Sequence, residues 1–353
     1  MRRISTAVVA AIIPTVLVTT VSPALADNAA FAWNASDTGV TTELRGLSVV
    51  SDQVAWAGGL GGTILRTTNG GGSWQKVSPT GREALDFRDI EAFSADRAIA
   101  LATGENDKSL ILLTTDGGAT WTETFKNTEP KAFYDCAAFT DATHGLALSD
   151  PVDGKFRIIA TADAGATWTV QPNAGMPPAK EKEYAFAATG SCLVAPPGAA
   201  AGTYLFASGG PDASHVYKTV DNGVTWTVAD TTFPATEYGG ASSLAFRNAT
   251  EGVAVGGDAK AAAGASGGVA VTGDAGASWK GAAKAPADFR SGAAWVDVAG
   301  NTLVAVGMTG SDVSTDGGQS WTTFDKTNLF SIDCAASACF AVGADGKAAT
   351  LTR

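Results

Sequence analysis

The segment Thr114-Thr-Asp-Gly-Gly-Ala-Thr-Trp121 decides the fold of this chain, because five other segments repeat its pattern. The shared form is Ser/Thr-x-Asp-x-Gly-x-Ser/Thr-Trp, and the copies end at Trp74, Trp121, Trp168, Trp226, Trp279 and Trp321. Successive tryptophans lie 42 to 58 residues apart. A period of this length is typical of one four-stranded sheet in a radial array of sheets. The repeats therefore predict an all-β protein.

Each residue type in the repeat suits a tight turn between two strands. The acidic position is held by Asn69, Asp116, Asp163, Asp221, Asp274 and Asp316. Its side chain can accept hydrogen bonds from the N–H groups and hydroxyl of its own turn, and the glycine supplies a positive φ. The tryptophan begins the next strand and buries a large ring between neighbouring sheets. Asn69 can make much the same turn as aspartate, so the first copy still predicts a blade.

The residues around each repeat indicate three further short strands. Around the first copy we expect three strands before the turn, at 44–50, 54–57 and 63–66, and a fourth that begins at its tryptophan, at 74–77. The second copy repeats this pattern at 87–90, 98–101, 110–113 and 121–124. These runs alternate in polarity and are separated by glycine, aspartate and asparagine, and none has a helical period.

Six repeats do not limit the ring to six blades. After Trp321 the chain still supplies strands at 329–334, 339–342 and 348–352, and the segment 30–33 near the N-terminus has no other assignment. We therefore predict a seven-bladed β-propeller whose last blade is closed by the N-terminal strand, which leaves no unpaired edge in the ring. A six-bladed ring with a loose C-terminal hairpin is the alternative.

The first residues have the features of an export signal. Arg2 and Arg3 precede an uncharged apolar stretch, and Ala24-Leu-Ala26 is typical of a cleavage site. We predict a signal peptide at 1–26, a single propeller domain at 27–353, and a secreted, periplasmic or cell-envelope location. With 24 basic and 35 acidic side chains the net charge is −11, which disfavours nucleic acid as a partner, and we expect no direct insertion into membranes.

Four cysteines in an exported chain suggest disulfides. Cys334 and Cys339 flank four residues between two apolar runs, which suits a bridge across a tight hairpin. Cys136 and Cys192 would then pair by default or stay as buried thiols. With only two histidines, neither near a cysteine pair, and no dinucleotide-binding motif, we predict no metal and no cofactor.

A candidate binding site lies where the innermost strands begin. Laid over one another, these strands place Arg45, Arg88 and Arg290 at equivalent positions in three blades, with Tyr134 in the matching place of a fourth. Asp89, Asp135 and Asp333 lie in or next to the following position, with Glu183 close by. Converging arginines suit a carboxylate or an acidic peptide segment. Alternatively, these arginines and acids pair with each other as a solvated rim.

The repeat resembles the Asp-box, or BNR, repeat. Nearly the whole chain is similar to the photosystem II stability/assembly factor family and its exported bacterial relatives. The resemblance rests on Arg45-Gly-Leu-Ser, Trp56-Ala-Gly and the segments 143–155, 185–191 and 252–257. It implies a protein- or peptide-binding role in assembly, partly through an arginine patch and without chemistry, although nothing in the sequence indicates photosynthesis.

The Asp-box is also found in sialidases, which use an arginine triad. The sequences Phe87-Arg-Asp-Ile and Phe289-Arg-Ser-Gly lack the proline of the sialidase signature. This weaker resemblance implies an alternative function, a glycoside hydrolase acting on a glycan, with Tyr134, Glu183 and Asp135 as candidate catalytic residues. If the protein is an enzyme, we expect a glycoside hydrolase and not an oxidoreductase.

Overall fold

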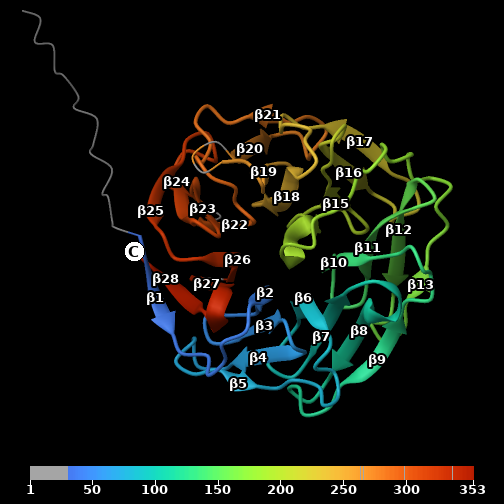
Figure 1. Cartoon of the computed structure of the whole chain (residues 1–353), viewed down its shortest axis with the longest axis vertical. Coiled ribbons are helices and arrows are strands. Elements are labelled where there is room, and N and C mark those ends of the chain that lie inside the picture. The colour runs from blue at the N-terminus through green and yellow to red at the C-terminus, as the bar shows by residue number, and fades with distance from the viewer. Residues whose placement is uncertain (1–30, 263, 265, 298, 336) are drawn as a thin grey trace, which may run out of the picture. The chain divides into compact units, whose positions relative to one another are not determined.

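The computed structural model describes residues 31–353, except 263, 265, 298 and 336; the expected signal peptide at 1–26 lies outside this range. Seven four-stranded antiparallel sheets are arranged in a ring, with their innermost strands toward the centre (Figure 1). The protein is therefore the predicted seven-bladed β-propeller. No helix among the described residues is long and apolar enough to span a membrane.

The strands follow one another from the centre of each blade outward. Blades 1 to 3 contain β2 (Leu44–Val49), β3 (Ala55–Gly59), β4 (Thr63–Thr67) and β5 (Gln75–Lys76); β6 (Asp86–Ala92), β7 (Ala98–Thr103), β8 (Leu110–Thr114) and β9 (Thr122–Lys126); β10 (Tyr134–Phe139), β11 (Gly145–Val152), β12 (Lys155–Thr161) and β13 (Thr169–Val170).

The remaining blades follow the same order. Blades 4 to 6 contain β14 (Leu193–Val194), β15 (Tyr204–Ala207), β16 (His215–Thr219) and β17 (Thr227–Asp230); β18 (Gly239–Phe246), β19 (Gly252–Asp258), β20 (Gly267–Thr272) and β21 (Lys280–Gly281); β22 (Gly292–Asp297), β23 (Thr302–Gly307), β24 (Gly310–Ser314) and β25 (Thr322–Asp325). Blade 7 contains β26 (Leu329–Ala335), β27 (Ala338–Gly343), β28 (Ala348–Thr352) and β1 (Ala32–Ser36), and three 3₁₀ turns occur as η1 (Asn106–Lys108), η2 (Gly190–Cys192) and η3 (Ala344–Gly346).

The N-terminal strand closes the ring. β1 pairs antiparallel with β28, from Ala32 opposite Thr352 to Ser36 opposite Ala348. The indole N–H of Trp33 also donates to Ser311 Oγ of blade 6 at 2.9 Å. The prediction of seven blades is confirmed and the six-bladed alternative is wrong, because the C-terminal hairpin acquires its fourth strand from the other end of the chain.

The six repeat turns have one hydrogen-bonding pattern. The first Ser/Thr hydroxyl donates to the Asp or Asn side-chain oxygen at 2.8–3.0 Å. In the five aspartate copies the second Ser/Thr hydroxyl donates to the other carboxylate oxygen at 2.5–2.6 Å. In the first copy this second bond runs in the opposite direction, because Asn69 Nδ2 donates to Ser73 Oγ at 3.0 Å. Each turn fixes the hairpin between the third and fourth strands of its blade.

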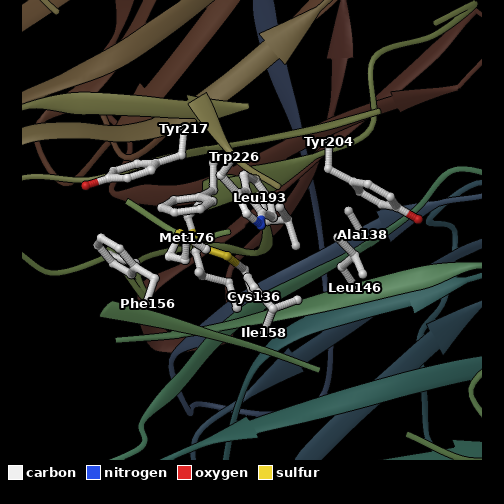
Figure 2. Packing of buried hydrophobic residues seen from close by; sticks show 14 residues of the cluster. Cys136, Ala138, Leu146, Phe156, Ile158, Met176, Leu193, Tyr204, Tyr217 and Trp226 are labelled. Atoms are coloured by element: carbon white, nitrogen blue, oxygen red, sulfur yellow. A yellow bond between two sulfur atoms is a disulfide. The ribbon is translucent and has the colours of Figure 1, made fainter. Parts of the chain in front are cut away.

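Apolar side chains between neighbouring blades form the core. The cluster between blades 3 and 4 contains Phe156, Trp226 and the Cys136–Cys192 disulfide (Figure 2). Cys334 and Cys339 form the second disulfide and lie opposite each other in the β26–β27 hairpin. The expected hairpin bridge is therefore present, and of the two alternatives left open for Cys136 and Cys192 the structure shows the disulfide.

Candidate functional site

A β-bulge at the start of the innermost strand sets which side chain reaches the centre of the ring. In blade 1 the register passes from Leu44 to Gly46 and leaves Arg45 at the bulge. In blade 2 the bulge residue is Arg88, and in blade 3 it is Asp135. A bulge re-aims its extra side chain relative to its neighbours. Asp135 is therefore the structural equivalent of the two arginines.

The expected alignment of Tyr134 with Arg45 and Arg88 is wrong by one residue. Tyr134 precedes the bulge, like Phe87 in blade 2, and its ring packs in the core between blades 2 and 3. Its ring centroid lies 5.1 Å from that of Phe125. Burial raises the pKa of its hydroxyl well above the usual range. The sequence alone gave no sign of the bulge.

Arg290 is also displaced from the expected position. The N–H of Ser291, and not of Arg290, donates to Val306 O at the point where β22 meets β23. Arg290 is buried, and its Nε lies 2.5 Å from Asp312 Oδ2. A second donor, Nη1, binds Thr309 Oγ1 at 2.9 Å. The guanidinium is thus enclosed between β22 and β24, and only two of the three predicted arginines share a position.

Arg45 and Arg88, here called the arginine pair, lie on neighbouring blades and have matching contacts. Each Nε binds an acid two residues earlier in the chain, Glu43 for Arg45 and Asp86 for Arg88, the latter at 2.6 Å. The Arg45 guanidinium also lies over the Phe330 ring, 4.3 Å from its centroid. The side chains of Arg45 and Arg88 are 19 % and 31 % exposed. Neither Nη2 makes a hydrogen bond to a described residue.

A segment of the chain reaches the middle of the ring (Figure 1) and contacts the arginine pair. Residues 185–192, here called the central segment, end the long connection from β13 to β14 and reach the middle of the ring (Figure 1, yellow-green). Arg88 Nη1 donates to Ala187 O at 2.9 Å, and Arg45 Nη1 donates to Ala188 O at 3.2 Å. The disulfide to Cys136 holds the end of the segment against blade 3.

The central segment explains why blade 4 has the shortest innermost strand among the described blades. β14 contains two residues because the chain before Leu193 leaves the sheet. Further bonds tie the segment to other blades: Ala185 N–H to Asp150 Oδ1 at 2.8 Å, and Ser191 Oγ to Ser243 Oγ at 2.7 Å. Sequence reasoning named residues 185–191 only for their family resemblance and did not predict that they reach the centre of the ring. The 58-residue interval between Trp168 and Trp226 was the only signal that pointed to extra chain in this blade.

Glu183 lies just before the central segment and is buried in a cluster of hydrogen bonds. Its Oε1 accepts from Ser208 Oγ at 2.6 Å and from Tyr217 Oη at 3.1 Å, and it lies 2.8 Å from His215 Nδ1. Burial opposes its charge, but the bonds from His215, Ser208 and the Lys180 N–H outweigh this and lower its pKa. The carboxylate is engaged within blade 4.

Asp135 is buried, and neither of its carboxyl oxygens makes a well-aligned hydrogen bond to a described residue, although the backbone N–H of Asp150 faces the carboxyl group. Burial and the nearby charge of Asp150 raise its pKa well above the usual range, whereas Arg88 acts in the opposite direction. Burial also raises the pKa of Asp150 to about 7. Burial thus shifts both carboxyls toward the protonated form, and Asp135 lies near the charge of Arg88.

Two other predicted acids, Asp89 and Asp333, line a cavity of about 370 Å³ formed by the innermost strands, together with Glu91, which the sequence analysis did not single out. Asp89 and Glu91 of blade 2 and Asp333 of blade 7 lie in its wall, and Gly190 and Ser191 of the central segment contribute to it. Burial raises the pKa of Asp89 to about 7 and that of Asp333 to about 6. Burial and the charges of these two raise the pKa of Glu91.

Asp89 and Asp333 each connect two neighbouring blades. Asp89 Oδ2 accepts from the Ala137 N–H of blade 3 at 2.5 Å, and Asp333 Oδ2 accepts from the Val49 N–H of blade 1 at 2.7 Å. Among the described residues no group of three His, Cys, Asp or Glu side chains has the arrangement of a metal site.

Comparison with known proteins places the fold among solved propellers. The chain matches no protein-family model and no curated protein. The structure of YCF48 bound to D1 peptide is 15 % identical, with a TM-score of 0.63 over 91 % of this chain and 95 % of that one. YCF48 from Cyanidioschyzon merolae is 18 % identical, with a TM-score of 0.63 over 90 % and 98 %.

An enzyme also shares the architecture. The GH74 enzyme of Niastella koreensis is 16 % identical, with a TM-score of 0.52 over 87 % of this chain and 51 % of that one. At these identities the likeness establishes the fold alone. The chain is a seven-bladed β-propeller similar in structure to YCF48, a photosystem II assembly factor, at low sequence identity.

Proposed function

We propose that this protein is an exported peptide- or protein-binding module whose partner docks at the arginine pair. One observation carries the proposal: two arginines at equivalent positions of neighbouring blades are fixed by the acids beside them, and the Nη2 of each has no hydrogen-bond partner within the described part of the chain. Preorganised guanidinium donors suit recognition of oxygen acceptors. The propeller is expected to act by binding, without chemistry.

The similarity to YCF48 supports this proposal. That protein has the same fold and has been solved with a peptide bound. Concave surfaces at which loops and strand ends converge are common binding sites. With a signal peptide at 1–26, the partner of this chain would be encountered in the cell envelope or outside the cell.

The test is a binding screen of the mature protein on a peptide array, followed by affinity measurements. We expect the double substitution Arg45→Glu and Arg88→Glu to lower the affinity for these peptides by at least about tenfold, because both hydrogen-bond donors become acceptors. Lys76→Glu with Lys280→Glu is the matched control, because it changes the net charge equally at exposed outer strands. Circular dichroism of both variants checks their folding. An equal loss of peptide affinity in both variants, or no peptide bound by the wild-type protein, would contradict the proposal.

Glycoside hydrolysis, the alternative from the sialidase resemblance, has less support. Tyr134 packs in the core between two blades, and the Glu183 carboxylate is bonded within blade 4. Turnover of aryl glycosides by the wild-type protein, lost in Glu183→Gln, would favour this alternative over a binding role.

A further inference from the structure

We infer that the arginine pair selects uncharged main-chain carbonyl groups of an extended peptide and does not prefer carboxylates. This inference rests on the proposed binding function and specifies the chemistry of the partner. It differs from the acidic peptide that the arginines alone suggest.

The charge of each arginine is already balanced. Glu43 binds Arg45 Nε, and Asp86 binds Arg88 Nε at 2.6 Å, so each guanidinium carries its own counter-ion. An incoming carboxylate would meet these two acids as well as the two arginines. It would lose hydration without gaining a net attraction, whereas a neutral carbonyl has a much smaller desolvation cost.

The chain itself supplies an example of the preferred acceptor. Two donors of the arginine pair are bonded to the carbonyls of Ala187 and Ala188, which are consecutive residues with uncharged side chains. No carboxylate of the central segment takes part, because residues 185–192 contain no acidic residue. The pair therefore already functions as a holder of peptide backbone within this fold.

The geometry leaves one donor nitrogen per arginine for a partner. Nε and Nη1 are occupied on both guanidinium groups, whereas Nη2 makes no hydrogen bond to any residue that the structure describes. The stacking of Arg45 on Phe330 and the two bonds of Arg88 fix the planes of the groups. Fixed planar donors form hydrogen bonds with little further loss of side-chain entropy. An extended peptide lying over the central segment could present its carbonyls to both Nη2 atoms.

The experiment uses matched peptides derived from an uncharged, C-terminally amidated peptide that binds the mature protein. One derivative carries two glutamates, and another ends in a free carboxylate. We expect neither change to tighten binding by more than about twofold, and we expect the affinity of the parent to change little between 50 and 500 mM salt, because screening acts on net charge. The variant Glu43→Gln with Asp86→Asn keeps hydrogen-bond acceptors beside the arginines but removes their counter-ions.

For this variant we expect the preference for the glutamate peptide over the parent to rise about tenfold relative to the wild type, with a marked salt dependence of glutamate-peptide binding. A wild-type protein that prefers the glutamate peptide by tenfold or more would overturn the inference but leave the binding function intact. A protein that binds none of the uncharged or acidic peptides would overturn both. Unchanged specificity in the double variant would also count against the inference.

Discussion

Arg290 and Asp312 form a buried ion pair in which Nε lies 2.5 Å from Oδ2 and both side chains are 2 % exposed. Asp312 also accepts a hydrogen bond from Thr323 Oγ1 at 2.6 Å. This arginine therefore belongs to the core of blade 6, whereas Arg45 and Arg88 remain partly exposed at the face of the ring.

The three arginines should consequently respond differently to replacement by methionine. Arg290→Met leaves the charge of Asp312 buried without its partner, and we expect a loss of about 3–5 kcal/mol in the free energy of unfolding. Arg45→Met and Arg88→Met should cost about 0–1 kcal/mol each, since they break partly exposed pairs. Urea unfolding of the three variants measures this. A loss for Arg290→Met no larger than for the other two would contradict a structural role.

The Cys136–Cys192 disulfide should contribute more to stability than Cys334–Cys339. The cysteines of the first bridge are 56 residues apart in sequence, and those of the second are 5 residues apart. A disulfide removes more conformational entropy from the unfolded chain when this separation is larger. In the chain-entropy description the two bridges contribute about 4 and about 2 kcal/mol. Replacing each pair by alanine and comparing unfolding free energies tests the order. Only the Cys136/Cys192 variant should show faster hydrogen exchange at 185–192.

Replacing Asn69 by aspartate should stabilise the first blade. In the five aspartate copies a carboxylate accepts the second hydroxyl at 2.5–2.6 Å, whereas Asn69 donates to Ser73 at 3.0 Å. Charge-assisted bonds are the stronger kind, and we expect a gain of about 0.5–1 kcal/mol at pH 7.

This gain should have a defined pH dependence. In Asp274 the bonds from Ser278 and Thr272 lower the carboxyl pKa to about 2. A folded-state pKa below the unfolded value contributes stability that is present above about pH 4 and is lost as the pH falls toward 2. The difference in melting temperature between Asn69→Asp and wild type should shrink in the same range. A gain that persists at pH 2 would contradict the charge-assisted bond.

The buried acids predict the opposite trend at higher pH. The pKa of Asp333 is about 6 and that of Asp89 and Asp150 about 7, all raised by burial from near 4 in the unfolded chain. Between pH 4 and 7 the folded protein thus binds more protons than the unfolded one, and stability should fall as the pH rises through this window. We expect at least about 1.4 kcal/mol more stability at pH 5 than at pH 8, equal to one pKa unit.

Asp89→Asn is the control for this trend, because the amide oxygen can still accept the Ala137 N–H but cannot ionise. This variant should show a shallower decline in unfolding free energy between pH 5 and 8. An unfolding free energy of the wild type that stays constant or rises between pH 5 and 8 would contradict the raised pKa values of these carboxyls.

The sequence by itself determined the type of the blades and predicted seven of them, and the pairing of β1 with β28 in the structure excluded the six-bladed alternative. The repeats specify local turns: the side chain of Asp116, for example, is bonded to Thr114 and Thr120 of its own hairpin. The unassigned strands at both ends were enough to predict the closure by β1, because a propeller requires four strands per blade. Cys334 and Cys339 could be paired for the same local reason.

Only the tertiary structure decided which side chains reach the centre of the ring. One bulge residue at the start of an innermost strand places Asp135, and not Tyr134, beside Arg88, and Arg290 lies in the core instead of at the open face. The central segment likewise takes its place through the Cys136 disulfide and bonds to several blades. A turn is specified by residues adjacent in sequence, whereas the register of a strand depends on partners that the fold brings from far along the chain.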